Sequence, residues 1–281
     1  MRTQSMDTSP EAEQFQIALI RKAPLTKRFG LVRSLSYSTL YTNRQNIQEL
    51  HPDISEEEQS LIFVTDIYGQ ALANGLRGVL EERTTKVSDT PDILAVMKSV
   101  IDIFEQLGIA YYISGSVASS VYGMAQAAQD IDIIANLQPE HLQPLIAQLQ
   151  TDYYVDEDAV REAIQQRTWF NAIHLESILK IDVFLPKDRP FDQQVFSRIQ
   201  QHILEENYPP FSMVSPEDSI LTQLEWHHRG DKVADDRWNA ILGVLKVRSP
   251  TLDLAYLQQW ATALEIDNLL EQALIDAGLK E

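Results

Sequence analysis

The sequence predicts an α/β protein, in which an α+β core with a small mixed sheet is flanked by an N-terminal helical domain and a C-terminal helical bundle. Three observations carry this prediction. Residues 9–83 repeat apolar side chains at helical spacing, residues 111–134 and 169–186 contain short strand-like runs, and four helical segments follow residue 215. The expected order along the chain is therefore helical, α/β and helical.

Capping signals support the helices of the N-terminal part. Ser9 and Pro10 open the stretch SPEAEQFQIALIRKA as an N-cap and a first helical residue. Ser55 is followed three residues later by Glu58, which is the spacing of a capping box. We therefore expect a helical N-terminal domain over residues 1–90, acting as an accessory domain or as a fused regulator.

The boundaries of the core follow from a polar linker. Residues 83–92, RTTKVSDTPD, are polar and contain Pro91 close to their end. A capped helix follows and ends at Gly108, before the strand IAYYIS. We place the α/β core at 91–212 and the C-terminal helical region at 213–281, with helices over 215–228, 234–247, 252–264 and 266–277.

Composition excludes several classes of function. The 281 residues contain no cysteine, which excludes disulfides, thiolate zinc sites and cysteine nucleophiles. The formal net charge of −18 repels polyanions, so we expect no general DNA binding, although a local basic pocket for one nucleotide or a tRNA end is compatible with it. No apolar run approaches the roughly 20 residues that span a bilayer, and the first residues lack the apolar part of a signal peptide. The sequence thus predicts a cytoplasmic protein without a membrane partner.

Two acids lie one residue apart in the apolar strand DIDII. Successive strand side chains alternate between faces, so Asp130 and Asp132 share one face while Ile131 and Ile133 point into the core. Neighbouring carboxylates repel each other unless a cation lies between them, and Mg²⁺ prefers carboxylate and phosphate oxygens. The pattern predicts a site for a divalent cation.

A hairpin provides a third acid. In KIDVF, Asp182 shares its face with Lys180 and Phe184, on the second strand of a hairpin that turns near Glu176 and Ser177. Three carboxylates around two metals about 4 Å apart form a site for in-line phosphoryl or nucleotidyl transfer.

The turn before the acidic strand suits a phosphate. Gly115 lets the backbone approach a phosphate closely, and Ser116 offers a hydroxyl and an N–H at the start of a short helix. The 15 residues from Gly115 to Asp130 are enough for that helix and a turn, so a triphosphate could lie between the turn and the metals. Each feature alone has an ordinary explanation, as a turn, a cap or a solvent-facing acid; their order favours a site.

This order resembles the nucleotidyltransferase fold of the polymerase-β type, and specifically the AbiEii-type nucleotidyltransferases of toxin–antitoxin systems. The likeness runs over residues 94–279 through SGSVASS, QDIDI, FNAIHL, KIDVF, KDRPFD, SPEDSIL and ILGVLKV, and is closest to an uncharacterised prokaryotic branch. It implies that Gly115 and Ser116 hold nucleotide phosphates, that Asp130 and Asp132 bind two Mg²⁺ ions, and that Asp182 completes the metal site and acts as a base. Lys180 is a further candidate for binding the nucleotide.

The sequence departs from that pattern at four positions. Gln126 and Ala128 stand where relatives commonly have Arg and Thr, Gln223 where they tend to have Lys, and Ala240 where they often have Asp. Basic side chains at such positions neutralise phosphate charge in the transition state. We expect altered substrate choice, weak activity or binding without turnover, unless other basic residues compensate; the candidates are Lys180, Lys187, Arg189, Arg229 and Lys232.

The leading hypothesis is a Mg²⁺-dependent nucleotidyltransferase that moves a nucleoside monophosphate from an NTP to a hydroxyl of a protein or tRNA, in a toxin–antitoxin context. The alternative is a catalytically degenerate protein of the same fold that binds nucleotide or regulates a partner. A metal nuclease built on the same acids is a third reading, disfavoured by the Gly-Ser turn and the acidic surface. A homodimer and a toxin–antitoxin partner are both compatible with the sequence.

Overall fold

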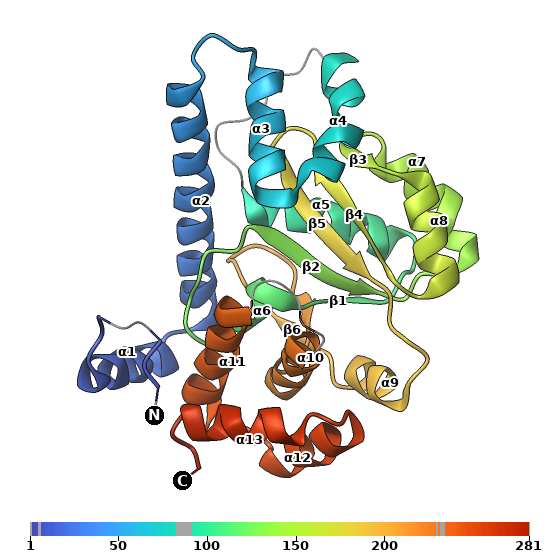
Figure 1. Cartoon of the computed structure of the whole chain (residues 1–281). Coiled ribbons are helices and arrows are strands. Elements are labelled where there is room, and N and C mark those ends of the chain that lie inside the picture. The colour runs from blue at the N-terminus through green and yellow to red at the C-terminus, as the bar shows by residue number, and fades with distance from the viewer. Residues whose placement is uncertain (1, 5–6, 83–91, 229, 231–233, 281) are drawn as a thin grey trace. The chain divides into compact units, whose positions relative to one another are not determined.

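The computed structural model describes residues 2–4, 7–82, 92–228, 230 and 234–280 (Figure 1). Helices and strands alternate through the middle of the chain, and the described N- and C-terminal parts are helical. The protein is therefore of the mixed α/β class that the sequence predicts. Most of the linker expected at 83–92 lies outside the described residues.

The contacts between residues divide the chain into two compact units, each assembled from segments distant in sequence. Unit 1 comprises residues 1–32, 112–126 and 188–281, and unit 2 comprises residues 33–111 and 127–187. The units do not coincide with the three consecutive blocks expected over 1–90, 91–212 and 213–281. That division into three domains stays a prediction, and the two units are described separately below.

Four strands form the sheet of unit 2 in the order β3 (Tyr153–Val155), β4 (Trp169–His174), β5 (Leu179–Phe184) and β2 (Asp130–Ala135). The hairpin partners β4 and β5 are antiparallel, as are β3 and β4, whereas β2 and β5 run parallel. The core-facing side chains of β2 and β5 are buried, among them Ile131 and Ile181 at 0% exposure. The expected hairpin and the expected inward-pointing isoleucines are confirmed.

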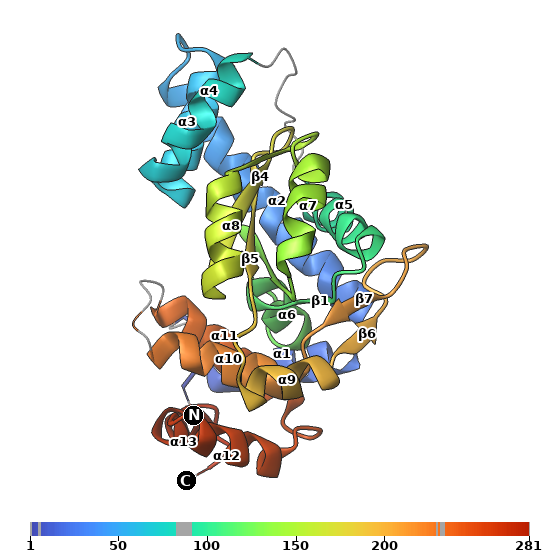
Figure 2. The same cartoon turned by 90° about the vertical axis from the view of Figure 1, so that its right-hand side faces the viewer.

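Helices surround this sheet, and two of them begin with a predicted cap. They are α3 (Glu56–Tyr68), α4 (Gln70–Glu82), α5 (Ile93–Gln106), the short η1 (Pro139–His141), α7 (Leu142–Leu149) and α8 (Glu157–Gln166), together with α2 (Leu25–Leu50) from residue 33 onward. Figure 2 shows α7 and α8 side by side along β4 and β5. Ser55 caps α3 by accepting from the N–H of Glu58, and Asp92 caps α5 while also pairing with Arg33 of α2.

Unit 1 is mainly helical. Its helices are α1 (Pro10–Lys22), α6 (Gly115–Tyr122), α9 (Pro190–Ser197), α10 (Pro216–His228), α11 (Ala234–Arg248), α12 (Leu254–Ala263) and α13 (Asp267–Asp276), together with α2 up to residue 32. The four helices expected after residue 215 are α10 to α13. Three short strands accompany them: β1 (Tyr111–Ile113) pairs in parallel with β7 (Phe211–Met213), which pairs antiparallel with β6 (Gln200–His202).

Helix α11 lies at the centre of unit 1 and contacts α6, α10, α13 and α1. Four of its residues from Ile241 to Leu245 are fully buried. A glycine permits the close approach of α6, because a Cβ on Gly123 would lie 2.6 Å from the backbone nitrogen of Val244. Any larger residue at position 123 would force α6 and α11 apart.

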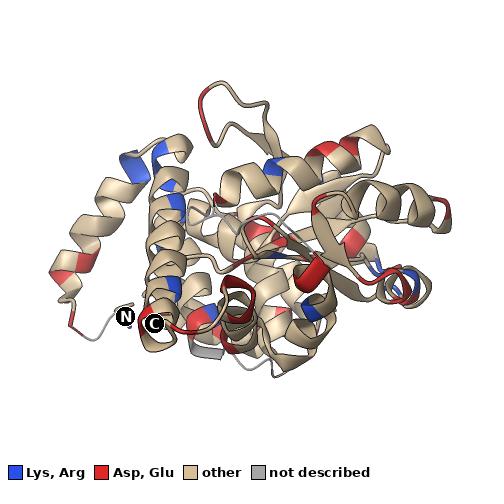
Figure 3. Cartoon of the chain, turned by 90° about the horizontal axis from the view of Figure 1, so that it is seen from above, with Lys and Arg blue, Asp and Glu red and all other residues tan. Residues whose placement is uncertain are grey.

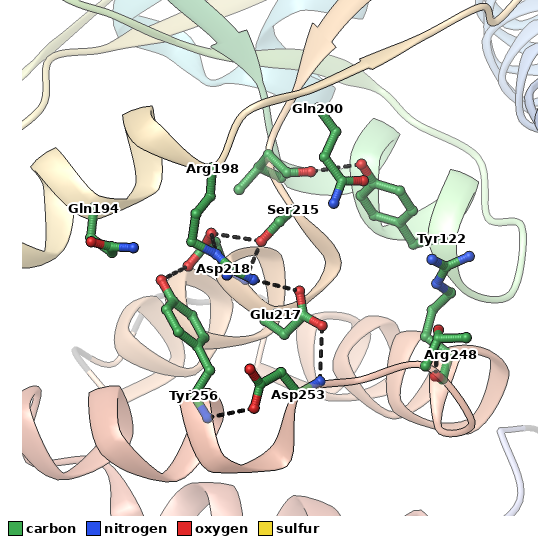
Figure 4. A network of polar contacts seen from close by, with 12 residues as sticks. Tyr122, Gln194, Arg198, Gln200, Ser215, Glu217, Asp218, Arg248, Asp253 and Tyr256 are labelled. Atoms are coloured by element: carbon green, nitrogen blue, oxygen red, sulfur yellow. Dashed lines mark hydrogen bonds and ion pairs between the residues drawn. The ribbon is translucent and has the colours of Figure 1, made fainter.

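A network of buried polar groups ties α10 to its neighbours (Figure 4). The side chain of Asp218 is fully buried and accepts from Ser215 Oγ at 2.6 Å, from Tyr256 Oη at 2.6 Å and from Arg198 Nε at 3.3 Å. Glu217 accepts from the N–H of Asp253 and pairs with Arg198. Residues 215–218 (SPED) therefore have a structural role, because their side chains join α10 to α12 and to the end of α9.

The sequence did not predict β3, α8, α9, β6 or β7. Each of the three strands has only three residues and depends on a partner elsewhere in the chain, so its own sequence contains too little periodicity.

Among the described residues, no helix is both long and apolar enough to cross a bilayer. Acidic residues are spread over many elements rather than gathered on one (Figure 3).

Candidate active site

The parallel pairing of β2 with β5 brings the acids of unit 2 together. Asp130 lies opposite Lys180, and Asp132 lies opposite Asp182. Residues opposite each other on neighbouring strands point to the same face, so the four charged side chains share one face of the sheet. The sequence predicted this shared face within each strand, and the register now places the two strands side by side.

Lys180 bridges two of the acids. Its Nζ lies 2.6 Å from Oδ2 of Asp182 and 3.2 Å from Oδ2 of Asp130. Burial works to lower the pKa of Lys180, but Asp182 and Asp130 together raise it above its ordinary value, so the ammonium is charged. Asp130 and Asp182 therefore share one ammonium, which leaves these three groups with a formal charge of −1.

Asp182 is the most buried of the three acids, with 8% of its surface exposed. Its Oδ2 is held by Lys180, whereas Oδ1 is buried without a hydrogen-bond partner. Burial raises the pKa of Asp182, and the adjacent Lys180 only partly offsets this effect. A buried carboxylate oxygen without a partner is costly, which indicates a place for a proton or a cation.

Tyr68, at the end of α3, lies close to Lys180 and to the start of β2. Its hydroxyl donates to the carbonyl oxygen of Gln129 at 2.9 Å, and Nζ of Lys180 lies 5.4 Å from the centre of its ring. Burial, followed by the charge of Asp130, raises the pKa of the Tyr68 hydroxyl well above its ordinary value. Sequence reasoning missed this residue because nothing in the pattern of α3 connects it with the acidic strand.

The donor set fits a hard divalent cation in its chemistry: it provides carboxylate oxygens on adjacent strands, a net negative charge and one unpaired buried oxygen. Within the described residues, however, no three His, Cys, Asp or Glu side chains form a group that could hold a metal ion as they stand. Asp130 and Asp182 instead contact Lys180. The metal-binding role of the three acids stays a prediction.

The Gly-Ser turn belongs to unit 1. Helix α6 begins at Gly115, which has a positive φ of 57°, a conformation that favours glycine. The Oγ of Ser116 is buried without a hydrogen-bond partner. A glycine turn with an unpaired hydroxyl at the start of a helix suits a phosphate, and its use together with the acids of unit 2 stays a prediction.

The structure shows what surrounds the four residues that depart from the expected pattern. The N–H of Ala128 donates to Ser36 Oγ, and that of Gln126 donates to Ser120 Oγ. Gln223 is buried and donates to Ser219, while Ala240 is half-buried on α11. None of these four residues supplies a cation.

The basic residues that could compensate are only partly described. Arg189 pairs with Asp192 at 2.6 Å and with Glu225 at 2.5 Å, and the hydrogen bond to Glu225 is the main cause that raises its pKa. Its guanidinium is therefore engaged within unit 1. Arg229 and Lys232 lie outside the described residues.

Comparison with models of known families finds none that matches, and comparison with curated proteins finds no match either. Among solved structures, an antigenic nucleotidyltransferase-like protein from Paracoccidioides brasiliensis is 14% identical, with 65% of this chain and 92% of that chain covered and a TM-score of 0.40. A structure of ANT(2″)-Ia in complex with adenylyl-2″-tobramycin is 13% identical, with 61% and 96% covered and a TM-score of 0.42. The solution structure of the antibiotic-resistance factor ANT(2″)-Ia is 14% identical, with 60% and 94% covered and a TM-score of 0.38.

These structures are nucleotidyltransferase-like proteins, and the likeness is distant in both identity and TM-score. It therefore assigns no activity to this chain.

Proposed function

We propose that this protein is a Mg²⁺-dependent nucleotidyltransferase that moves a nucleoside monophosphate from an NTP to an acceptor hydroxyl and releases pyrophosphate. The observation that carries the proposal is the register of β2 against β5, which places Asp132 beside the buried Asp182. Asp130, Asp132 and Asp182 would hold the metal ions, which would supply positive charge for the triphosphate. Gly115, Ser116 and Lys180 would bind the nucleotide.

Asp182 has the properties of a general base. Its raised pKa makes the carboxylate a better proton acceptor near neutrality than an ordinary aspartate. Its Oδ1 has no hydrogen-bond partner, so this oxygen is available for the proton of the acceptor hydroxyl. As that proton leaves, the acceptor oxygen forms a bond to the α-phosphorus and the bond to pyrophosphate breaks.

The acceptor that the charge favours is a protein hydroxyl. A net charge of −18 repels a tRNA, whereas a protein side chain carries no such penalty. A toxin–antitoxin context, with a protein partner or a homodimer, is part of the same proposal and rests on the resemblance of the sequence motifs.

The test is transfer of radiolabelled nucleotide. Full-length protein is incubated with each NTP and Mg²⁺, with tRNA or a protein fraction as acceptor, and labelled macromolecules are separated on gels. We expect Asp130→Asn and Asp182→Asn to lower the transfer rate about 100-fold or more. The control is Asp102→Asn, in a half-exposed ion pair with Lys98 on α5, which should leave the rate unchanged. Equal rates in Asp130→Asn and the wild type would contradict the proposal.

The second candidate is a degenerate protein that binds nucleotide without turnover. It is favoured by the uncharged Gln126, Ala128 and Gln223, and by the engagement of Arg189 in ion pairs. Calorimetric titration with ATP and Mg²⁺ separates the two candidates, because binding without labelled product supports the second. A regulatory role of the N-terminal helices is better tested by point variants than by truncation at residue 90, since residues 33–82 share a compact unit with the acids.

A further inference from the structure

The position of Lys180 has consequences for how a cation reaches the acids. Its ammonium contacts both Asp130 and Asp182, and its side chain is only 15% exposed. It thus lies where a cation shared by these two carboxylates would lie. A lysine in this place neutralises part of the repulsion between the acids when no metal is bound.

Tyr68 holds the lysine in that place. The aromatic ring lies 5.4 Å from Nζ, within the range of a cation–π contact, and the hydroxyl is anchored on the carbonyl of Gln129, next to Asp130. The ammonium is therefore bounded by two carboxylates on one side and an aromatic face on another. The attraction between these partly buried charges is screened less by solvent than that of a surface ion pair.

The lysine does not satisfy the cluster. Asp130 and Asp182 share a single ammonium, which leaves these three groups with a formal charge of −1, and Oδ1 of Asp182 is buried without a partner. A divalent cation would neutralise this remaining charge, but it would be repelled by an ammonium only a few ångströms away. The two cations compete for the oxygens of Asp130 and Asp182.

We propose that Lys180 is an exchangeable counter-ion: it occupies the acids in the metal-free protein and leaves them when a divalent cation binds, and Tyr68 is the positioning residue that favours the lysine-bound arrangement. The ligand class, a divalent cation on these acids, rests on the proposed function. Competition by Lys180 does not require that nucleotide is transferred. After leaving the acids, the ammonium is free to contact phosphate oxygens.

The test is the affinity for Mg²⁺ and Mn²⁺ without nucleotide, measured by calorimetry on the full-length protein. Lys180→Met keeps the length of the side chain and removes the charge. We expect this variant to bind the metal at least tenfold more tightly than the wild type, which is about 1.4 kcal/mol. Tyr68→Leu removes the aromatic face and should tighten binding by a smaller factor.

Two further variants control the comparison. Lys98→Met removes a lysine from the ion pair with Asp102 on α5 and should leave metal affinity unchanged. Lys180→Arg offers two donors to the carboxylates and should weaken metal binding relative to the wild type. This variant keeps the positive charge, so its metal affinity still tests the inference if Lys180→Met does not fold.

Equal or weaker affinity in Lys180→Met, with a native circular dichroism spectrum, would overturn the inference, as would tighter binding by Lys180→Arg. The absence of metal binding in every variant would overturn it too. The transfer assay keeps this result separate from the proposed function. If Lys180→Met binds metal more tightly but the wild type transfers no nucleotide, the counter-ion inference is supported and the proposed enzymatic function is wrong. If the wild type transfers nucleotide but Lys180→Met has unchanged metal affinity, the proposed function is supported and the counter-ion inference is wrong.

Discussion

Removing one partner of a buried ion pair in unit 1 should strongly destabilise the protein. Glu13 of α1 and Lys246 of α11 are 2.9 Å apart, and their side chains are 1% and 2% exposed. The other oxygen of Glu13 accepts from the N–H of Gln4 at 2.7 Å, and Lys246 also donates to the carbonyl of Arg2 at 2.5 Å. Lys246→Met leaves the Glu13 carboxylate buried without a counter-charge, which costs about 3–5 kcal/mol.

A matched pair on the surface provides the comparison. Arg77 and Glu58 lie 2.7 Å apart with side chains 46% and 48% exposed, so Arg77→Met should cost only about 0–1 kcal/mol. The double variant Glu13→Met/Lys246→Met should recover most of the loss, because an apolar pair replaces the charges. Urea unfolding followed by circular dichroism measures all four proteins. If Lys246→Met and Arg77→Met lose similar amounts, the argument from burial is wrong.

Two further outcomes follow from unit 1. Tyr256→Phe removes the hydroxyl that donates to the buried Asp218, and it should lower the free energy of unfolding by about 1–3 kcal/mol in the same urea titration. A loss below about 0.5 kcal/mol, which is typical of a surface substitution, would contradict a structural role for this hydrogen bond. Burial, followed by the charge of Arg248, lowers the pKa of His202 in the folded protein. As the pH falls below about 6.5, the unfolded chain therefore binds a proton at this residue before the folded protein does, and the free energy of unfolding should decrease. Thermal melts between pH 7 and pH 5 should show a smaller loss in His202→Gln than in the wild type, whereas parallel curves would exclude this linkage.

If the counter-ion inference holds, metal binding and the N-terminal helices are connected physically. Tyr68 belongs to α3, while the acids lie on β2 and β5 of the same unit. A change that moves the end of α3 would alter the hold on Lys180 and thereby the metal affinity. We therefore expect any regulation of metal binding by the N-terminal helices to act through Tyr68.

Local sequence was sufficient for the features that depend on near neighbours. The caps at Ser9 and Ser55 follow from side chains that reach backbone groups within the next three residues. The shared face of Asp130 and Asp132 follows from the two-residue period of a strand, and the hairpin from two such runs around a short turn. These regularities repeat within a few residues and are visible without the fold.

Tertiary structure decided which of these groups meet. Asp130 and Lys180 are 50 positions apart in the sequence, and their contact requires the parallel register of β2 and β5. Tyr68 reaches Gln129, and Glu13 meets Lys246, across still other separations. Sequence patterns record the spacing within an element, but burial and charge pairing arise between elements. For that reason the sequence could name the acids and Lys180 as candidates, but it could not predict that Lys180 contacts both Asp130 and Asp182.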